Sequence, residues 1–333
     1  MTALPSSLRD ALVLRGYVTG RSRVVTASRA PDGATKLLLE LMDGQRIECV
    51  SIPSRGKHLT ACVSCQVGCA MACVFCATGR AGLARSLLPF EILDQVLHVR
   101  WLEEEKKGTR QAKRRSAGQK PPSTTLPKGK ITHLVFMGQG EPAAALPSVL
   151  PALRRICGPW GLSMRGVTLS TVGVRGTLAR LARENLALTL AVSLHAPSQA
   201  LRAALVPSAR AYPLGELLED CAAYFLQTGR RISFEYVLLG GRNDQEAHAE
   251  QLVALLGRYR DRMRVHVNLI PWNAVEGAAF ESSSEQAVQA FVAVLENARI
   301  PVTVRRSKGR GAQAACGQLK NAGKALVKDL LEG

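Results

Sequence analysis

The stretch Cys69-Ala-Met-Ala-Cys73-Val-Phe-Cys76 places three cysteines within eight residues. The spacing, three residues and then two, curls one short loop so that three thiolates point toward a common centre. A cubic [4Fe–4S] cluster has four irons, and four thiolates normally saturate it. Three ligands leave one iron open, and S-adenosylmethionine has the amino and carboxylate groups that can chelate it. The motif therefore predicts a [4Fe–4S] cluster, held by Cys69, Cys73 and Cys76, that binds S-adenosyl-L-methionine.

The same motif, with the aromatic Phe75 before its last cysteine, resembles the signature of the radical S-adenosylmethionine (radical SAM) superfamily. The alternative is zinc, because Cys62-Val-Ser-Cys65 and Cys73-Val-Phe-Cys76 are both C-x2-C pairs. Seven residues separate these pairs, whereas zinc ribbons usually place roughly 15–20 between them. Cys69 would also have no role in a ribbon. The spacing favours the cluster over a zinc-ribbon RNA-binding protein.

The chain is strongly basic, with a formal net charge of +18 over 333 residues. Such an excess favours a polyanionic partner, most simply nucleic acid. Nine of the basic residues fall in 106–130, which contains no acid. With Pro121-Pro122 and several glycines, this segment is predicted to be a disordered, solvated insertion. It serves either as a tether for the RNA backbone or as a solubilising loop.

Cysteine usage and hydropathy indicate the compartment. Met1 to Leu14 lacks the basic and apolar regions of a signal peptide. No apolar run approaches the length of a membrane span. Nine cysteines without a secretory signal are typical of reduced thiols with chemical roles. We expect a cytoplasmic protein with no membrane partner.

Strand-like and helix-like segments alternate after the cysteine loop, which predicts βαβ units around a parallel sheet. The predicted strands are Ile131–Phe136, Val167–Ser170, Leu186–Ser193, Ile232–Leu239, Val265–Ile270 and Val302–Val304. The predicted helices are Phe90–Glu105, Leu146–Arg155, Thr177–Glu184, Leu214–Thr228, Gln245–Tyr259 and Glu285–Ala298.

With a first strand just ahead of the cysteines, these segments give an α/β fold, a partial (β/α)6 barrel of the radical SAM type. We expect the barrel over residues 61–333, carrying the basic insertion at 106–130. Residues 1–60 form an N-terminal extension, with a β-hairpin of Thr35–Leu41 and Arg46–Ile52 around Asp43-Gly44. In such barrels the chemistry lies at the carboxyl ends of the strands, where the cysteine loop and the motifs below are all expected.

Six motifs narrow the resemblance, and they occur in order between about Asp32 and about Leu319. They are Cys62-Val-Ser-Cys65-Gln-Val-Gly-Cys69, Phe136-Met-Gly-Gln-Gly-Glu-Pro142, Leu169-Ser-Thr171, Ser193-Leu-His-Ala196, Asn268-Leu-Ile-Pro-Trp-Asn273 and Ala314-Ala-Cys-Gly-Gln-Leu319. Together they resemble the RlmN/Cfr family of radical SAM RNA methyltransferases. The resemblance implies methylation of an adenine ring carbon in RNA.

The resemblance also implies residues that bind S-adenosylmethionine. Taken singly, each of them is also compatible with an ordinary turn, strand end or structural histidine. Their common placement after predicted strands, in family order, favours the cofactor role. The implied cofactor contacts are Gly140, Glu141, Ser170, Ser193, Leu194, His195 and Asn273.

Three further residues match catalytic positions of the family. Cys316 resembles a cysteine that is itself methylated and then donates that carbon, although a buried structural cysteine is the simpler interpretation of the residue alone. Cys62 resembles the second cysteine, which forms a transient disulfide with the first. Glu48 matches the proposed proton acceptor. By resemblance, a 5′-deoxyadenosyl radical activates the Cys316 methyl group, the resulting carbon radical adds to adenine, and Cys62 releases the product.

The sequence departs from the family pattern at three places. Only about 30 residues precede the hairpin, too few for the family's helical accessory domain. The stretch Gly309-Arg-Gly-Ala-Gln-Ala314 lacks the usual acidic residues, and Cys65 stands where serine is usual. The Pro271-Trp272-Asn273 sequence favours adenine carbon 2 over carbon 8.

The expected substrate is rRNA and/or tRNA, with an electron donor such as flavodoxin or ferredoxin and a monomeric enzyme. The alternative within the superfamily is a radical SAM enzyme that acts on a different substrate.

Overall fold

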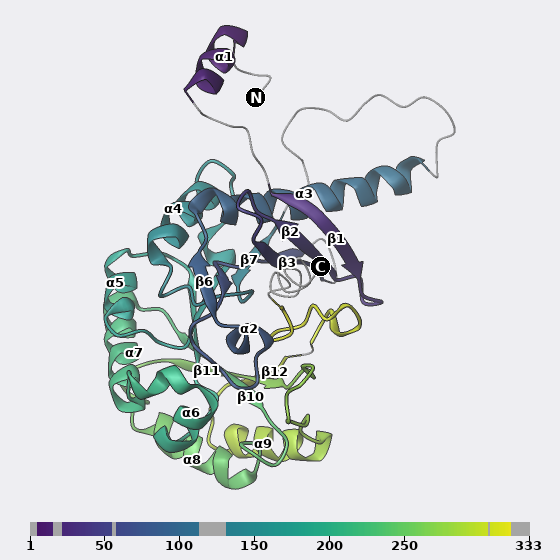
Figure 1. Cartoon of the computed structure of the whole chain (residues 1–333). Coiled ribbons are helices and arrows are strands. Elements are labelled where there is room, and N and C mark those ends of the chain that lie inside the picture. Colours follow the sequence, from purple (N-terminus) through teal and green to yellow (C-terminus); the bar gives the residue numbers. More distant parts are fainter. Residues whose placement is uncertain (1–4, 16–21, 55–57, 113–130, 306, 321–333) are drawn as a thin grey trace, which may run out of the picture.

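The computed structural model describes residues 5–15, 22–54, 58–112, 131–305 and 307–320. Within these ranges the chain forms one ten-stranded sheet, a separate two-stranded sheet and nine α-helices (Figure 1). The order of strands in the large sheet is β1-β2-β3-β4-β7-β8-β9-β10-β11-β12. β1 and β12 are its two edges, so the sheet is open.

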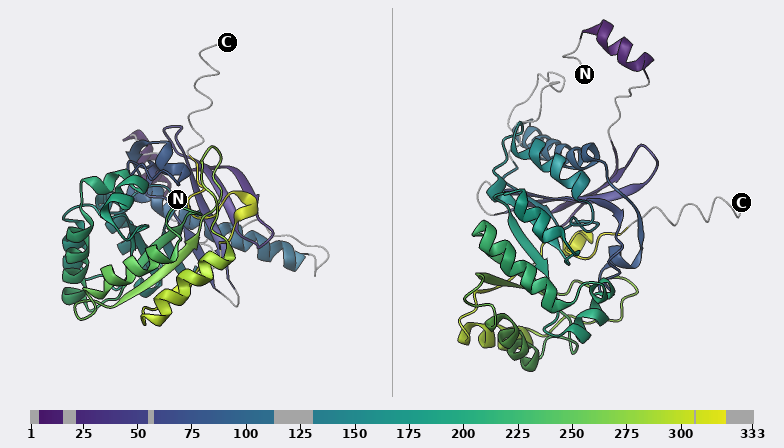
Figure 2. Two further views of the ribbon diagram at one scale, coloured as in Figure 1. Left: turned by 90° about the horizontal axis from the view of Figure 1, so that it is seen from below. Right: turned by 90° about the vertical axis from the view of Figure 1, so that its left-hand side faces the viewer.

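Every neighbouring pair from β4 to β12 is parallel. These strands are β4 (Leu59–Cys62), β7 (His133–Phe136), β8 (Val167–Thr171), β9 (Thr189–Ser193), β10 (Ile232–Leu238), β11 (Val265–Pro271) and β12 (Val302–Val304). The helices between them are α3 (Pro89–Ala112), α4 (Leu146–Cys157), α5 (Thr177–Arg183), α7 (Leu214–Thr228), α8 (Glu246–Gly257) and α9 (Glu285–Asn297). Six βα units and a last strand therefore confirm the expected α/β partial barrel. Figure 2 shows the sheet curving inside its helical layer.

The predicted hairpin is present and has a third strand that the sequence analysis missed. β1 (Arg23–Arg29), β2 (Thr35–Glu40) and β3 (Arg46–Pro53) are antiparallel, and β3 also pairs antiparallel with β4. The turn is made by Asp43-Gly44, where the Asp43 carboxylate accepts from the Gln45 amide at 3.1 Å and Gly44 has φ of +78°. The hairpin thus continues the barrel sheet. A helix, α1 (Ser6–Leu14), comes before it.

Short elements that were not predicted shape the loops at the mouth of the barrel. β5 (Gln66–Gly68) and β6 (Leu83–Ser86) form the two-stranded sheet, with α2 (Ala77–Arg80) between them. α6 (Gln199–Leu205) follows β9, and the Ser198 hydroxyl caps it by accepting from the Leu201 amide at 3.4 Å. Elements of three to seven residues carry too little periodicity for a prediction from sequence.

The first part of the basic insertion is helical, so its prediction as disordered is wrong for Lys106–Ala112. α3 continues to Ala112, because most residues of this stretch are good helix formers. The remainder, 113–130, lies outside the described residues.

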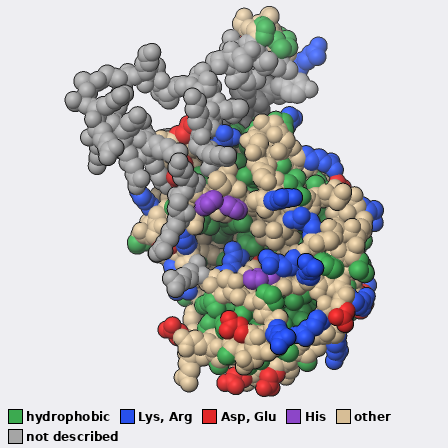
Figure 3. All heavy atoms as spheres, turned by 180° about the vertical axis from the view of Figure 1, so that it is seen from behind, with side chains coloured by type: hydrophobic (Ala, Val, Ile, Leu, Met, Phe, Trp, Pro, Cys, Tyr) green, Lys and Arg blue, Asp and Glu red, His purple; other side chains and the backbone are tan. Residues whose placement is uncertain are grey.

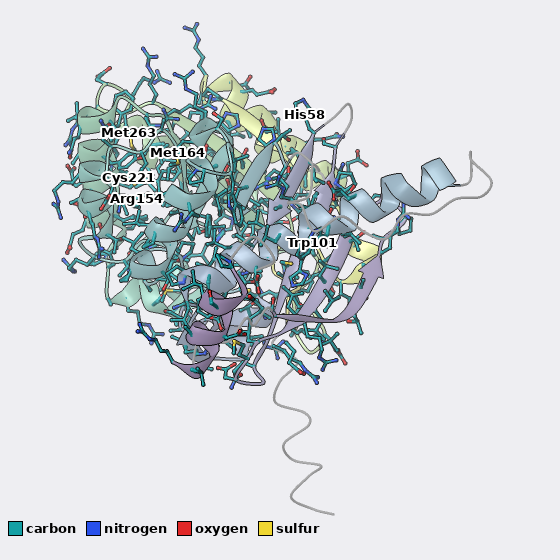
Figure 4. The ribbon with its side chains drawn as sticks, turned by 90° about the horizontal axis from the view of Figure 1, so that it is seen from above. His58, Trp101, Arg154, Met164, Cys221 and Met263 are labelled. Atoms are coloured by element: carbon teal, nitrogen blue, oxygen red, sulfur yellow. The ribbon has the colours of Figure 1, made fainter. Side chains whose placement is uncertain are left out.

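The main core lies between the sheet and the helices. β10 is buried along almost its whole length, as expected for a parallel strand covered on both faces. Figure 4 shows Cys221 of α7 and Arg154 of α4 on the helical side, with His58 and Trp101 on the side of β3 and α3. No described helix is long and apolar enough to cross a membrane.

Candidate active site

The cysteine loop joins β5 to α2 and faces one cavity. Cys69 and Cys73 are buried, Cys76 is half-buried, and all three line the cavity. Two backbone bonds close the loop, from Cys76 N–H to Cys73 O at 3.1 Å and from Cys69 N–H to Gly82 O at 2.8 Å. Gly79 lets α2 pack against it, because a Cβ there would lie 2.8 Å from the Cys73 nitrogen.

The three thiols have the chemistry that an iron–sulfur cluster needs. Burial raises the pKa of Cys69 to about 12 and that of Cys73 well above its usual range. Soft thiolate ligands on one loop fit such a cluster, and loading it would release the thiol protons. Over the part of the chain that the structure describes, no group of three or more His, Cys, Asp or Glu side chains could hold a single metal ion.

The opposite wall of the cavity is built from the carboxyl ends of β7 to β11, where the residues expected to bind the cofactor were placed. Nine of the predicted ligands and cofactor contacts share this one cavity: Cys69, Cys73, Cys76, Gly140, Glu141, Ser170, Ser193, His195 and Asn273. Leu194 differs. Its side chain is fully buried in the main core and is not among the lining residues.

The glycines after β7 serve close packing. A Cβ on Gly138 would lie 2.7 Å from the Val63 carbonyl, and one on Gly140 would lie 2.6 Å from the Gln66 side chain. Gly140 also has φ of +101°, which favours glycine. These bare positions bring the loop after β7 against the segment that leads into the cysteine loop. The main structural effect of Gly138 and Gly140 is therefore to shape this wall of the cavity.

Glu141 is a buried carboxylate that fastens two strand ends. Its Oε1 accepts from the Ala143 amide at 2.9 Å and its Oε2 accepts from the Val172 amide at 2.8 Å. Burial raises the pKa of this carboxyl, while the hydrogen bonds from Thr171 and the two amides oppose that shift. Glu141 is thereby held in a fixed position at the cavity.

His195 has a defined tautomer. The Val237 amide donates to its Nδ1 at 3.1 Å, so the proton of the neutral ring is on Nε2. Burial, with Arg202 nearby, lowers the pKa of His195 to about 3. Its φ of +61° is unusual for a non-glycine residue. Its ring packs edge-to-face with the Phe75 ring, with the two ring centroids 5.0 Å apart.

Asn273 connects the cavity wall to the Cys316 loop. Its Nδ2 donates to the Cys316 carbonyl at 3.1 Å, and its Oδ1 accepts from Arg310 Nε at 2.9 Å. The Ala77 amide of α2 also donates to Gly317 O at 2.9 Å. The loop that carries Cys316 is thus attached to both walls of the cavity.

Cys316 lines the first cavity and also a second, adjoining one, which Cys62 and Arg305 line with it. Burial raises the pKa of Cys62 to about 12, and Arg305 and the Met137 amide partly oppose this shift. Cys316 is exposed as a residue, yet its thiol is enclosed enough that burial raises its pKa, against Arg305. All nine cysteines lie within the described residues, and each is a free thiol.

Glu48 lies on β3 and is not among the residues that line either cavity. Its Oε1 pairs with Lys36 at 2.8 Å, and its Oε2 accepts from the Lys320 amide at 2.8 Å. Burial raises the pKa of its carboxyl, while Lys36 opposes that shift. It is buried, rather than solvent-facing as an isolated strand glutamate usually is.

The sequence analysis missed Glu235 and Arg305. Glu235 lines the first cavity, is 3% exposed, and accepts from Asn268 at 2.8 Å and from Arg305 at 3.0 Å. A single acid inside the largely apolar strand Ile-Ser-Phe-Glu-Tyr-Val-Leu was the available signal. Arg305 follows β12 and had no comparable signal.

Comparisons with known proteins agree with this arrangement. No protein-family model matches the chain. It is 44% identical over 328 residues to a protein of Synechococcus elongatus named as a probable dual-specificity RNA methyltransferase RlmN, covering 96% of this chain and 82% of that one. It is 44% identical over 330 residues to the Synechocystis protein of the same name, covering 99% and 85%. A crystal structure of a radical SAM methyltransferase from Sphaerobacter thermophilus superposes with a TM-score of 0.83 at 39% identity, covering 96% and 87%.

The barrel, the cysteine loop and these similarities define a radical SAM methyltransferase. Its substrate class is RNA. The chain belongs to the RlmN family of RNA methyltransferases.

Proposed function

We propose that this enzyme methylates a ring carbon of adenine, carbon 2, in rRNA and/or tRNA by way of a methylated Cys316. The observation that carries the proposal is the position of Cys316, which lines both the cavity of the cysteine loop and the cavity of Cys62. A group that carries a carbon must reach the place where it is activated and the place where it is released. Cys316 lines both cavities, so it could serve both steps.

In this proposal the cluster is held by Cys69, Cys73 and Cys76. S-adenosylmethionine is held by Gly140, Glu141, Ser170, Ser193, His195 and Asn273, with Leu194 contributing only its backbone. When bound, the cluster would supply the electron for radical chemistry on S-adenosylmethionine. Neutral His195 presents Nε2–H as a fixed donor.

The chain's own chemistry then runs through two thiols. Cys316 first accepts a methyl group on sulfur and loses its thiol proton. A hydrogen atom is next removed from that methyl group, and the resulting carbon radical bonds to adenine. The adduct then loses one electron, which would return to the oxidised cluster, and the ring proton, so that enzyme and RNA are linked by an ordinary covalent bond. The Cys62 thiolate attacks the Cys316 sulfur and forms a disulfide. The bond from sulfur to the transferred carbon breaks with its electron pair going to the carbon, which takes a proton from solvent and becomes the methyl group of the product. Arg305, beside both thiols, favours the thiolate forms.

Glu48 remains the proposed proton acceptor for the adenine ring proton. A buried carboxylate with a raised pKa suits that role. Its ion pair with Lys36 would have to loosen when RNA binds, because Glu48 lies outside both cavities in this structure.

The charge of the protein supports an RNA backbone as partner. Lys and Arg side chains spread across the face seen in Figure 3, and the acidic side chains gather mainly toward its lower edge. The basic segment 106–130 adds nine cations, most of them outside the described residues. A flavodoxin or ferredoxin as electron donor and a monomeric enzyme complete the proposal.

The test is anaerobic turnover with S-adenosylmethionine whose methyl group carries three deuteriums. Nucleoside mass spectrometry of the RNA then reports both position and route. If the Cys316 methyl group loses one hydrogen before transfer, the product adenine keeps two deuteriums, at carbon 2. Three retained deuteriums would mean direct transfer and would contradict the route. Label at carbon 8, or no labelled adenine, would contradict the substrate assignment.

A further inference from the structure

Arg202 of α6 is a buried cation. Its side chain is fully buried, with 0% exposure. None of the ion pairs found between described residues involves Arg202. Most of the arginines that do form such pairs have exposed side chains. Burial without a paired anion is costly for a guanidinium.

The hydrogen bonds of Arg202 are incomplete. Its Nη2 donates to Val172 O at 2.5 Å and to Ser193 O at 3.4 Å, at the ends of β8 and β9. Its Nε and Nη1 are buried and have no partner among the residues described. Burial lowers the pKa of Arg202 only to about 10, so the side chain stays charged at neutral pH.

The segments that surround the guanidinium pack against the cysteine loop. Val172, whose carbonyl binds Arg202, packs in the same buried cluster as Cys73 and Leu205. The Val74 amide, one residue after Cys73, donates to Leu205 O at 3.1 Å and so fixes α6 against the loop. The backbone around Arg202, at Val172 and at the end of α6, is therefore the same backbone that packs against Cys73 and Val74.

No neutralising group was found among the other described neighbours. Tyr212 and Cys221 lie near enough to influence Arg202, but burial raises the pKa of both, so both are neutral. His195 is neutral as well, since its pKa is lowered. Among the described residues, Nε and Nη1 of Arg202 therefore have neither a hydrogen-bond acceptor nor a neutralising anion.

We propose that Arg202 is the counter-charge of the iron–sulfur cluster: it stabilises the negative charge of the thiolate-bound cluster and raises its reduction potential. This inference rests on the proposed cluster at Cys69, Cys73 and Cys76. An oxidised [4Fe–4S]²⁺ core with three thiolates has a net charge of −1, and reduction makes it −2. A fixed cation beside it favours the reduced, more negative form, since net charge and hydrogen bonds to sulfur set cluster potentials. Arg202 lines neither of the two cavities, so in this proposal it acts through its charge and is not a catalytic residue.

The test compares Arg202→Gln with Arg202→Lys in the full chain, reconstituted anaerobically with iron and sulfide. The readout is a redox titration followed by electron paramagnetic resonance. Gln removes the charge and keeps an amide donor, so we expect the ratio of reduced to oxidised cluster at a fixed potential to fall at least tenfold, about 59 mV for one electron. Lys keeps the charge and should stay much closer to wild type. Arg154→Gln, at an exposed arginine of α4 (Figure 4), is the matched control and should not change the potential.

Each outcome of this experiment either supports the counter-charge role of Arg202 or contradicts it. Wild-type protein that binds no iron would overturn the proposed cluster itself, and this inference with it. A wild-type cluster whose potential is unchanged in Arg202→Gln would overturn the inference alone. So would an equal shift in Arg202→Lys, or weaker binding of S-adenosylmethionine at an unchanged potential. If the Gln variant retains no cluster, retention by the Lys variant supports the counter-charge, and loss in both variants overturns it.

Discussion

The indole Nε1 of Trp272 donates to the backbone carbonyl of Phe75 at 3.0 Å. This bond joins the residue that follows β11 to the middle of the cysteine loop, between Cys73 and Cys76. Trp272 is buried in the same cluster as Phe75 and Cys73. The last part of the barrel therefore holds the loop formed near its beginning.

Trp272→Phe should loosen the cysteine loop without unfolding the barrel. The change keeps an aromatic ring but leaves the Phe75 carbonyl without its donor, which costs about 1–3 kcal/mol. Opening of the loop should then become about 5- to 150-fold more frequent, since every 1.4 kcal/mol is tenfold. Release of iron to a chelator, followed by absorbance, measures this. Trp160→Phe, at a half-buried tryptophan packed on the main core, should leave the rate unchanged, and equal rates in both variants would show that the bond does not restrain the loop.

Cys62→Ala and Cys316→Ala should fail at different steps. Without Cys62, Cys316 is still methylated and activated, but the protein remains covalently attached to RNA. Without Cys316 no attachment forms, and the double variant behaves in the same way because the earlier step is absent. A denaturing gel with and without nuclease separates these outcomes. Cys157→Ala, at a half-buried thiol of α4 that contacts Met164, should turn over normally. Normal release of RNA by Cys62→Ala would mean that another thiol resolves the adduct.

Release of the RNA adduct should accelerate with pH. Burial raises the pKa of Cys62 to about 12, and only the thiolate attacks sulfur. Below that pKa the thiolate fraction rises about tenfold for each pH unit, so the rate constant for release should rise similarly between about pH 7 and 9. Adduct accumulated at low pH and transferred to higher pH reports this rate on a quenched gel. Arg305→Met removes a cation that lowers this pKa and should slow release at every pH in this range. A flat pH profile would exclude thiolate attack as the limiting step.

The six basic residues of 113–130 should contribute to RNA affinity by neutralising phosphates. Their replacement by glutamine should weaken binding and reduce the slope of log affinity against log salt, by about 0.7–0.9 for each phosphate that is no longer neutralised. Binding titrations at several salt concentrations measure this slope. The matched control replaces three exposed arginines of the helical layer, Arg180, Arg183 and Arg258. A slope that changes equally per charge in both variants would identify the segment as a solubilising loop.

The sequence was most informative where apolar residues recur over several turns or strand pairs. The predicted segment Leu214–Thr228 matches α7, and the six predicted parallel strands agree with β7 to β12 within a few residues. The sequence carried less information for β1 and β6, whose residues are largely exposed. Their pairing depends on the neighbouring strand rather than on local pattern. α6 is held by its contact with the cysteine loop, which no local pattern could show.

The residues of the site likewise include some that the sequence could predict and some that it could not. The motifs that follow strands converge on one cavity because parallel strands end at the same edge of the sheet. Leu194 could not be separated from its neighbours in Ser193-Leu-His195, since only the direction of each side chain distinguishes them. Glu48 was placed by resemblance, and its ion pair with Lys36 depends on the hairpin register. The free donors of Arg202 become visible only when every hydrogen bond around it is accounted for.

The hairpin and the Cys316 loop hold one another. The Gly309 amide donates to the Asp32 carboxylate at 2.7 Å, Lys36 Nζ donates to Gln313 O at 3.2 Å, and Lys308 Nζ donates to Pro53 O at 2.5 Å. Because a chain is synthesised from its N-terminus, the hairpin and the loop of Cys69, Cys73 and Cys76 leave the ribosome long before the segment that carries Cys316. The contacts between the hairpin and the Cys316 loop can therefore form only after residues 307–320 have been synthesised. Under the route proposed above, the sulfur that accepts the methyl group would thus be the last part of the site to be put in place.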